Sequence, residues 1–345
     1  MKFSHVEGIR SLALVGATGL VGREFLQLLS EHKIKIAVMK LLASDESAGE
    51  VLEIEDRTFR VDAIDENSFK DIEVAFFSVP SDVTKKFVPL AVEAGSLVID
   101  DSSVYRMKKE VPLVVPQVNG FLLRQFEGGI LSTPNCTTTP LVLMLKPLLD
   151  SYGLKRVVVS TYQSVSGAGT VAYEELSKQT VSLLNGTEPS LEFFPHRIAF
   201  NTLPLIGRVL ENGNSEEEEK VVKETQKILG VPNLKVSATA VRVPTFCGHG
   251  LSVNVELAKD FSVDEVRELF DGFPGVKVLD KPEAHIYPTN IECTGSDYTF
   301  VGRIRRDYSI SHGLNFWVMT DNLRKGAALN VLECLETLYN YRRMS

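Results

Sequence analysis

The chain has 345 residues and a formal net charge of −8, with 44% hydrophobic and 24% charged residues. Length and composition are typical of a soluble globular protein of about two domains, and the acidic balance argues against nonspecific nucleic-acid binding, which requires a basic surface. No apolar run approaches the roughly 18 residues of a membrane span, residues 1–10 are too polar for a signal peptide, and the four cysteines follow no zinc or disulfide pattern, so we expect a cytoplasmic protein without a metal.

The first predicted elements are a strand, a glycine-rich turn and a helix. Residues 12–15 (LALV) form a short apolar run, the turn GATGLVG follows at 16–22, and residues 24–31 have helical apolar spacing. This order is typical of the phosphate-binding start of a Rossmann unit, where a helix N-terminus faces the dinucleotide. The candidate cofactor residues of the turn are Gly16, Thr18, Gly19, Leu20, Val21 and Gly22.

Further strands alternate with helical segments. Residues 37–42, 74–79 and 97–100 are predicted strands and residues 81–94 a predicted helix, which together indicate a parallel sheet with right-handed crossovers. The loop SDES at 44–47 lies where Rossmann folds recognise the adenosine ribose, and an acidic side chain there favours a 2′-hydroxyl over a 2′-phosphate. Simple solvation of these acids is the alternative. The candidate cofactor residues of the loop are Ser44, Glu46 and Ser47.

A cysteine then stands between a strand and a helix. Cys136 lies in STPNCTTTP at 132–140, after the apolar run 129–131 and before the apolar-periodic segment 141–149. Backbone N–H groups and the positive end of a helix dipole favour a thiolate at such a place, which makes Cys136 a candidate nucleophile. The alternative is a small buried cysteine that only packs.

The second half mixes strands and helices. Predicted strands cover 155–161, 238–244 and 251–257, and predicted helices cover 216–229 and 323–341, the last capped by Asp321 and Asn322. His249 is expected in a glycine-flanked turn between two strands, either facing a cleft or as a plain surface residue. Residues 178–210 are expected to form a helix and an extended loop that contribute an oligomer contact.

Seven segments in register resemble aspartate-β-semialdehyde dehydrogenase over essentially the whole chain. The resemblance implies an α/β fold, with an N-terminal Rossmann-type parallel-sheet domain at 1–135 and 322–345 and an α+β catalytic and dimerisation domain at 136–321. The segments are GATGLVG at 16–22, DDSSVYRMKKEVPLVVPQVN at 100–119, STPNCTTTPLVLMLKPL at 132–148, TYQSVSGAG at 161–169, EEEEKVVKETQKIL at 216–229, VRVPTFCGHG at 241–250 and DNLRKGAA at 321–328.

The resemblance also implies roles for individual residues. Cys136 matches the nucleophile, His249 the acid/base and Gln163 the glutamine that orients the substrate. Substrate-binding roles fall on Arg242 for the carboxylate, Glu217 for the amine, and Arg106, Lys220 and Asn135 for the phosphate. Further cofactor contacts fall on Ser166, Gly167 and Asn322.

The implied reaction is the reductive dephosphorylation of L-aspartyl 4-phosphate to L-aspartate 4-semialdehyde, in the biosynthesis of lysine (through diaminopimelate), methionine and threonine. Cys136 would expel phosphate to form a thioester, a nicotinamide hydride would reduce the thioester, and His249 would move the proton. The nicotinamide and Cys136 would have to share one cleft. The family also implies a homodimer and the cofactor NADP.

Two departures affect the cofactor. Glu46 replaces the arginine expected to contact the 2′-phosphate of NADP, and Glu50 replaces a lysine, so we expect NAD to be used comparably.

Three other identities compete with the resemblance. N-acetyl-glutamyl-phosphate reductase usually has Cys-Tyr-Pro-Thr where Cys136 precedes three threonines, glyceraldehyde-phosphate dehydrogenase fits GATGLVG poorly, and a catalytically silent cofactor sensor would not need the nucleophile.

Overall fold

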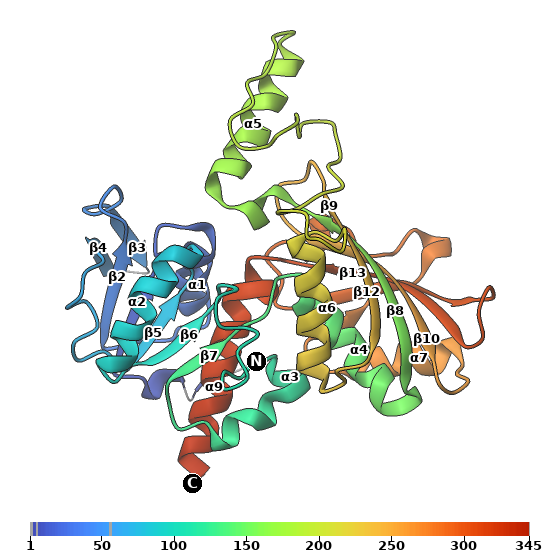
Figure 1. Ribbon diagram of the computed structural model, residues 1–345, viewed down its shortest axis with the longest axis horizontal. Coiled ribbons are helices and arrows are strands. Elements are labelled where there is room, and N and C mark those ends of the chain that lie inside the picture. Colours follow the sequence, from blue (N-terminus) through green and yellow to red (C-terminus); the bar gives the residue numbers. More distant parts are fainter. Residues whose placement is uncertain (1–2, 5, 55–56, 345) are drawn as a thin grey trace. The chain divides into compact units, whose positions relative to one another are not determined.

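The computed structural model describes residues 3–4, 6–54 and 57–344 and divides the chain into two compact units (Figure 1). Unit 1 comprises Met1–Asn135 and Ala327–Ser345, and unit 2 comprises Cys136–Gly326. The chain therefore passes out of unit 1 immediately before Cys136. Among the described residues, no helix combines the length and the apolar composition needed to cross a membrane.

Unit 1 contains a seven-stranded sheet within the described residues, in the order β3-β4-β2-β1-β5-β6-β7. All neighbouring strands are parallel except the antiparallel pair β3–β4. The strand order reverses at β1, which is the position where doubly wound folds bind nucleotides. The strands are β1 (Ser11–Val15), β2 (Val38–Ala43), β3 (Val51–Ile54), β4 (Arg57–Ala63), β5 (Val74–Phe77), β6 (Leu97–Asp100) and β7 (Ile130–Ser132).

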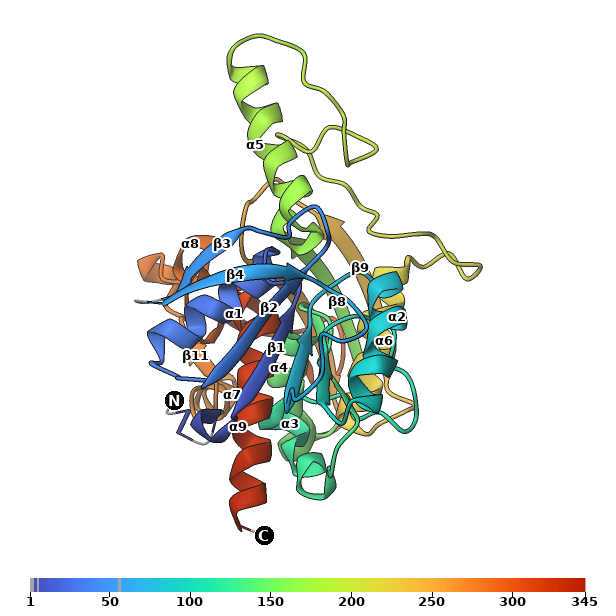
Figure 2. The same cartoon turned by 90° about the vertical axis from the view of Figure 1, so that its left-hand side faces the viewer.

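Helices cover both faces of this sheet (Figures 1 and 2). Leu12 and Leu14 of β1 pack into a core with the helices α1 and α9, whereas Ala13 and Val15 pack into a second core with α2. A strand buried on both faces has a continuous apolar sequence, as in LALV. The helical elements are η1 (Val6–Gly8), α1 (Leu20–Glu31), α2 (Ser81–Glu93), α3 (Pro116–Asn119), η2 (Gly120–Gln125) and α9 (Leu329–Met344).

Unit 2 contains a mixed six-stranded sheet within the described residues, in the order β11-β12-β13-β10-β8-β9. The pairs β8–β9 and β11–β12 are parallel and the others antiparallel. The strands are β8 (Leu154–Gln163), β9 (Lys235–Arg242), β10 (His249–Leu257), β11 (Val276–Val278), β12 (Thr299–Asp307) and β13 (Gly313–Thr320).

One face of this sheet is covered by α4, which packs between α6 and α7. Leu251, Val253 and Val255 of β10 are buried, while Ser252 between them is exposed, so the strand shows the alternation of a sheet with one covered face. The helical elements are α4 (Thr138–Tyr152), η3 (Val165–Ala168), α5 (Thr170–Leu184), α6 (Glu216–Leu229), α7 (Val263–Asp271), η4 (Pro282–Ala284), α8 (Asn290–Cys293) and the π-helical turn η5 (Arg324–Ala328).

The helix α5 and the extended chain after it form an arm, residues 170–210, that projects from the sheet of unit 2 (Figures 1 and 2). Two buried polar side chains on α5 hold the extended chain. Glu175 accepts hydrogen bonds from the N–H groups of Phe193 (2.7 Å) and Phe194 (3.1 Å). Gln179 accepts from the N–H groups of Ile198 and Ala199. The expected helix and extended loop in this region are confirmed.

The last helix differs from the prediction. Asp321 accepts hydrogen bonds from the N–H groups of Leu323 and Arg324, as a cap does. Residues 324–328 then form the π-helical turn η5, and the α-helix begins only at Leu329. A π-turn widens the backbone locally and is frequent at functional sites. Helical periodicity alone does not distinguish it from an α-helical turn.

Candidate active site

Cys136 precedes α4, whose N-cap residue is Thr137. Its side chain is partly exposed, in contrast to the buried thiols of Cys293 and Cys334. The turn η5 passes against its backbone, because a Cβ added at Gly326 would lie 3.1 Å from Cys136 Cβ and 3.2 Å from its carbonyl oxygen. A side chain at position 326 would therefore require the two segments to move slightly apart. The strand-to-helix position predicted for the nucleophile is confirmed.

Three of the predicted site residues lie side by side at the ends of adjacent strands. Gln163, the last residue of β8, pairs with Arg242, the last residue of β9, and with His249, the first residue of β10. Their side chains are at most 5% exposed. Register therefore brings together residues that are far apart in sequence.

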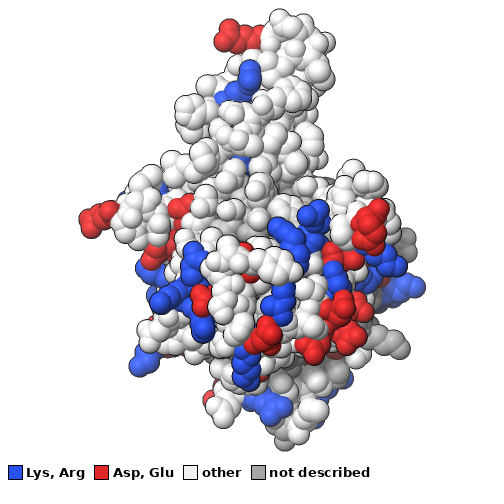
Figure 3. Space-filling model, turned by 90° about the vertical axis from the view of Figure 1, so that its right-hand side faces the viewer, with Lys and Arg blue, Asp and Glu red and all other residues white. Residues whose placement is uncertain are grey.

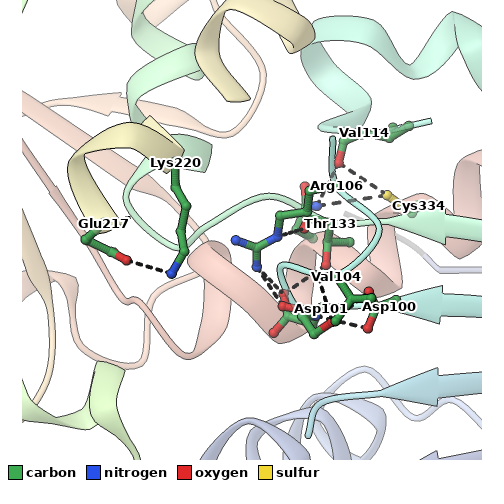
Figure 4. A network of polar contacts seen from close by, with 11 residues as sticks. Asp100, Asp101, Val104, Arg106, Val114, Thr133, Glu217, Lys220 and Cys334 are labelled. Carbon is green, nitrogen blue, oxygen red and sulfur yellow. Dashed lines mark hydrogen bonds and ion pairs between the residues drawn. The ribbon is translucent and has the colours of Figure 1, made fainter. Parts of the chain in front are cut away.

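Glu217 joins these three from α6, where it lies in the first turn. It accepts a hydrogen bond from Gln163 Nε2 (3.2 Å) and pairs with Lys220 Nζ (3.2 Å), one helical turn along (Figure 4). Glu217 and Lys220 are three residues apart on α6 and therefore lie on the same helix face. We call Gln163, Glu217, Arg242 and His249 the strand-end cluster.

Arg242 is the buried cation of the strand-end cluster. Its Nη1 donates to the carbonyl oxygen of Ser164 over 2.7 Å. Burial lowers the pKa of its guanidinium, and the negative charges of Glu217 and Cys136 oppose that shift. Arg242 thus interacts electrostatically with both Cys136 and Glu217.

His249 is buried, with 0% of its surface exposed, and opens a strand instead of standing in a turn as expected. Its Nδ1 accepts a hydrogen bond from the Ser164 N–H (3.1 Å) and lies 3.2 Å from Ser164 Oγ. Its Nε2 has no hydrogen-bond partner among the described residues. Burial first, and the charge of Arg242 second, lower the pKa of His249 to about 3, against the opposing effect of Glu217.

Gly167 packs closely against this imidazole. A Cβ at Gly167 would lie 2.9 Å from His249 Nε2, closer than real Cβ atoms come, and 3.1 Å from Arg242 Nη1. Gly167 and its neighbour Ser166 belong to the small-residue turn η3. This close approach explains why a glycine stands at position 167.

Asn322 links the loops around His249. Its Oδ1 accepts hydrogen bonds from Ser164 Oγ (3.1 Å), Ser166 Oγ (3.2 Å) and the Gly248 N–H (3.0 Å), and its Nδ2 donates to Ser166 Oγ. The amide thereby holds η3 against the start of β10. Sequence reasoning placed Asn322 at the cofactor and missed this internal linkage.

The predicted phosphate residues Arg106 and Asn135 belong to unit 1. Arg106 lies in the loop after β6 and is 6% exposed. Its Nε donates to the Thr133 carbonyl oxygen (2.9 Å) and its Nη2 to the Asp101 carbonyl oxygen (2.6 Å; Figure 4). These bonds fix the guanidinium on the segment that leads to Cys136. Asn135 is also buried.

The glycine turn of unit 1 fits a dinucleotide phosphate. Gly16 has φ +92°, and a Cβ there would lie 2.3 Å from the Ser78 carbonyl oxygen. A Cβ at Gly22 would lie 2.2 Å from the Gly16 carbonyl oxygen, whereas one at Gly19, the N-cap of α1, would meet only that oxygen at 3.4 Å. The turn is tightly closed and brings the first N–H groups of α1, at Leu20 and Val21, beside Thr18, where a pyrophosphate can bind.

The 44–50 loop after β2 is largely exposed, including Ser44 and Glu46, with Ser47 half-buried. Glu50 accepts a hydrogen bond from Arg23 Nη2 (3.2 Å), and Arg23 Nε donates to the Thr18 carbonyl oxygen in the glycine turn (3.0 Å). Lys40, a basic residue of the preceding strand β2, donates to the Ser68 carbonyl oxygen (3.1 Å). Arg23 is thus a cation beside the glycine turn that the sequence did not single out.

Sequence reasoning missed Ser164, Gly248 and Gly326. Gly248 has φ +84°, and a Cβ there would lie 2.8 Å from Cys293 Sγ. All three lie within segments of the family resemblance, but nothing in the sequence indicates that Ser164 meets an imidazole 85 positions away. In the described ranges, no group of three His, Cys, Asp or Glu side chains could hold a metal ion.

Known proteins match both halves of the chain. The family model "Semialdehyde dehydrogenase, NAD binding domain" matches residues 11–126, and "Semialdehyde dehydrogenase, dimerisation domain" matches residues 145–325. An aspartate-semialdehyde dehydrogenase of Aquifex aeolicus is 47% identical over 95% of this chain and 97% of its own length.

Solved structures agree with these matches. Aspartate semialdehyde dehydrogenase II complexed with ASA from Vibrio cholerae has a TM-score of 0.91 and 38% identity, covering 96% of this chain and 98% of that one. The Candida albicans aspartate semialdehyde dehydrogenase with NADP has a TM-score of 0.74 and 26% identity, covering 96% and 99%.

Proposed function

The chain belongs to the aspartate-semialdehyde dehydrogenase family, and we propose that it reduces L-aspartyl 4-phosphate to L-aspartate 4-semialdehyde with a nicotinamide cofactor. The observation that carries the proposal is the strand-end cluster, in which a buried arginine, glutamate, glutamine and histidine meet, and in which the charge of Cys136 influences the pKa of Arg242. The family relationship does not favour N-acetyl-glutamyl-phosphate reductase or a silent cofactor sensor. The reaction class places the enzyme in the biosynthesis of lysine, methionine and threonine.

The substrate carries a carboxylate, an amine and an acyl phosphate, and each group has a counterpart. Arg242 binds the carboxylate, because a guanidinium can form two parallel hydrogen bonds to it. Glu217, which is buried and negatively charged, binds the amine. Arg106, Lys220 and Asn135 bind the phosphate, and Gln163 orients the acyl group.

Cys136 supplies the covalent step. Its thiolate attacks the acyl carbon and expels phosphate, which leaves a thioester. The nicotinamide supplies hydride to the thioester carbon when it is bound. The N-terminal end of α4 and the charge of Arg242 stabilise the thiolate before attack and after release.

We propose that unit 1 binds the cofactor through Gly16, Thr18, Gly19, Leu20, Val21 and Gly22, with Ser44, Glu46 and Ser47 at the ribose. Ser166, Gly167 and Asn322 are proposed contacts from unit 2. NADP is the family habit, but Glu46 and Asp45 oppose a 2′-phosphate and Glu50 neutralises Arg23. NAD is therefore used comparably.

The arm of unit 2 supports a homodimer. Val181, Leu184, Leu191 and Phe200 are more than half exposed, and Figure 3 shows few charged side chains on the visible face of the arm. Exposed apolar surface of this kind marks a protein contact, and a second copy is the occupant that the matched dimerisation domain favours. Leu184→Glu should shift sedimentation toward the monomer, while Val38→Glu, at an exposed apolar residue of unit 1, should not.

All four cysteines are thiols and none forms a disulfide, which favours the cytoplasm as the location.

The test is the reverse reaction. Phosphate-dependent reduction of NAD or NADP is followed with L-aspartate 4-semialdehyde and, separately, with N-acetyl-glutamate semialdehyde. We expect turnover only with the first substrate and only with phosphate or an analogue. Turnover with the acetylated substrate alone, or with neither, would contradict the proposal.

A further inference from the structure

We propose that Asp101 and Thr133 are positioning residues for Arg106, and that the Thr133 hydroxyl sets the affinity of Arg106 for phosphate by holding the Asp101 carboxylate short of direct contact with the guanidinium. The inference rests on the proposed function, which assigns Arg106 to the phosphate, and it adds two residues to which the family resemblance gave no role. It is carried by a closed ring of contacts that lies entirely in unit 1 (Figure 4).

Strand register places Asp101 and Thr133 next to each other. β6 and β7 are parallel neighbours, and their last residues, Asp100 and Ser132, are register partners. The pairing continues by one more hydrogen bond, from the Thr133 N–H to the Asp100 carbonyl oxygen (3.1 Å). Asp101 and Thr133 are therefore the first residues beyond the carboxyl ends of two adjacent parallel strands, which is the edge of the sheet where such folds bind ligands.

The backbone of these two residues fixes the guanidinium of Arg106. Arg106 Nε donates to the Thr133 carbonyl oxygen (2.9 Å), and Nη2 donates to the Asp101 carbonyl oxygen (2.6 Å). Two hydrogen bonds from different nitrogens define the plane of the rigid guanidinium group. The side chain is thereby ordered before an anion arrives, so binding the anion costs less conformational entropy.

The side chains of the same two residues close the ring. Thr133 Oγ1 donates to Asp101 Oδ1 over 2.9 Å, and that carboxylate oxygen lies 3.9 Å from Arg106 Nη2. At this distance the oxygen attracts the guanidinium but does not accept a hydrogen bond from it. Thr133 is 0% exposed and the Asp101 side chain 13%, so water screens the attraction only weakly.

The Asp101 carboxylate and a phosphate compete for the same positive charge. Carboxylates and phosphates both form charge-assisted hydrogen bonds with arginine. Without the Thr133 hydroxyl, the carboxylate would lose a donor and would turn toward Arg106 Nη2, which would weaken phosphate binding. The other acid at this strand end, Asp100, is held elsewhere, because its two oxygens accept from the N–H (3.1 Å) and Oγ (2.9 Å) of Ser102.

The first test measures the KM for phosphate in the oxidation of L-aspartate 4-semialdehyde. Thr133→Val, which is nearly isosteric, removes the hydroxyl and should raise this KM about tenfold, with much smaller changes in kcat and in the KM for the semialdehyde. Thr133→Ser keeps a hydroxyl and should stay within about threefold of the wild type. Thr337→Val, the same change at a half-buried threonine of α9, is the control and should leave the KM for phosphate unchanged.

The decisive variant combines Thr133→Val with Asp101→Asn. It removes the competing charge together with the hydroxyl, so the KM for phosphate should return to within about threefold of the wild type. A double variant as weak as Thr133→Val would overturn the inference, because a merely structural defect is not reversed by removing the carboxylate. An unchanged KM in Thr133→Val would overturn it as well.

Calorimetric titration of the whole chain with inorganic phosphate separates this inference from the proposed function. The wild type should bind phosphate, Thr133→Val should bind it about tenfold more weakly, and the double variant should recover. This order of affinities in a wild type and variants that do not turn over the semialdehyde would refute the proposed function alone. An active wild type whose phosphate affinity is insensitive to both substitutions would refute this inference alone, and an inactive wild type that binds no phosphate would refute both.

Discussion

The strand-end cluster of unit 2 and the 44–50 loop of unit 1 hold their charged groups in opposite ways. Arg242 and Glu217 are 5% and 6% exposed and are bonded within the unit. Glu50 of the loop pairs with Arg23 of α1, and these two side chains are 45% and 51% exposed. Buried charges interact strongly, so replacing one partner of a buried pair is strongly destabilising, whereas an exposed pair contributes at most about 1 kcal/mol to the free energy of unfolding. Under the proposed function, the reaction should therefore depend on the first region and the choice between NAD and NADP on the second.

The largest effect should follow from the nucleophile next to the cluster. Cys136→Ser should lower kcat by several orders of magnitude, because a hydroxyl ionises far less readily than a thiol and is a poor leaving group. Steady-state assays of the semialdehyde oxidation measure this. Cys334→Ser, a buried cysteine of unit 1, is the matched control and should keep most of the activity. Near-normal turnover of Cys136→Ser would refute the thioester.

Arg242→Lys should have the next largest effect. The positive charge remains, but the two parallel hydrogen bonds of a guanidinium are lost. The KM for L-aspartate 4-semialdehyde should therefore rise about 10–10²-fold, with a smaller change in kcat. Lys235→Arg, at the exposed start of the same strand, is the control and should change neither parameter. An unchanged KM in Arg242→Lys would show that the carboxylate binds elsewhere.

The buried imidazole should make stability depend on pH. Unfolded histidine takes up a proton near pH 6.5, whereas His249 stays neutral down to about pH 3, so the unfolded state binds more protons between these values. The stability from this group is complete above the unfolded pKa and is lost as pH falls. The free energy of unfolding of the wild type, relative to His249→Gln, should therefore drop by roughly 2 kcal/mol from about pH 8 to about pH 5.

Denaturant titrations of both proteins at the two pH values measure this difference. A constant difference between wild type and His249→Gln would mean that the imidazole is not depressed in the folded chain. If the wild type instead gained stability relative to His249→Gln as pH falls, the effect would have the opposite sign and would indicate a protonated His249.

The smallest effects belong to the loop. Glu46→Arg should raise the NADP/NAD ratio of kcat/KM by about tenfold, and Glu50→Gln, which frees Arg23, by a few-fold, in line with the energies of exposed pairs. Glu53→Gln, an exposed acid on β3, is the control. A wild-type preference for NADP of about 100-fold, or an unchanged ratio in Glu46→Arg, would show that these acids do not set the preference.

Sequence patterns predicted the elements whose apolar periodicity is strong. The strands at 12–15 and 97–100 and the helix at 216–229 have the expected bounds within a residue or so. The antiparallel pair β3–β4 was not predicted, because its residues are mostly exposed and show no clean alternation. The roles of the site residues came from the family resemblance, not from periodicity.

Geometry supplied what the sequence could not. The pairing of Gln163 with Arg242 and His249 is a property of strand register, which no local pattern encodes. His249 was expected in a turn because glycines flank it, yet Gly250 continues into the strand, where a side chain would strike Trp317. Its Nδ1 accepts a hydrogen bond from the Ser164 N–H, a contact that only the folded chain creates.

The account's central claim is that Cys136 carries the acyl group during turnover. Mixing the enzyme with L-aspartate 4-semialdehyde and oxidised cofactor, without phosphate, should give a single burst of about one reduced cofactor per active site and then stop. Mass spectrometry of the quenched protein should place the aspartyl group on the peptide that contains Cys136, and added phosphate should release it and restore turnover. A steady rate without phosphate, or an acyl group on another residue, would contradict the claim.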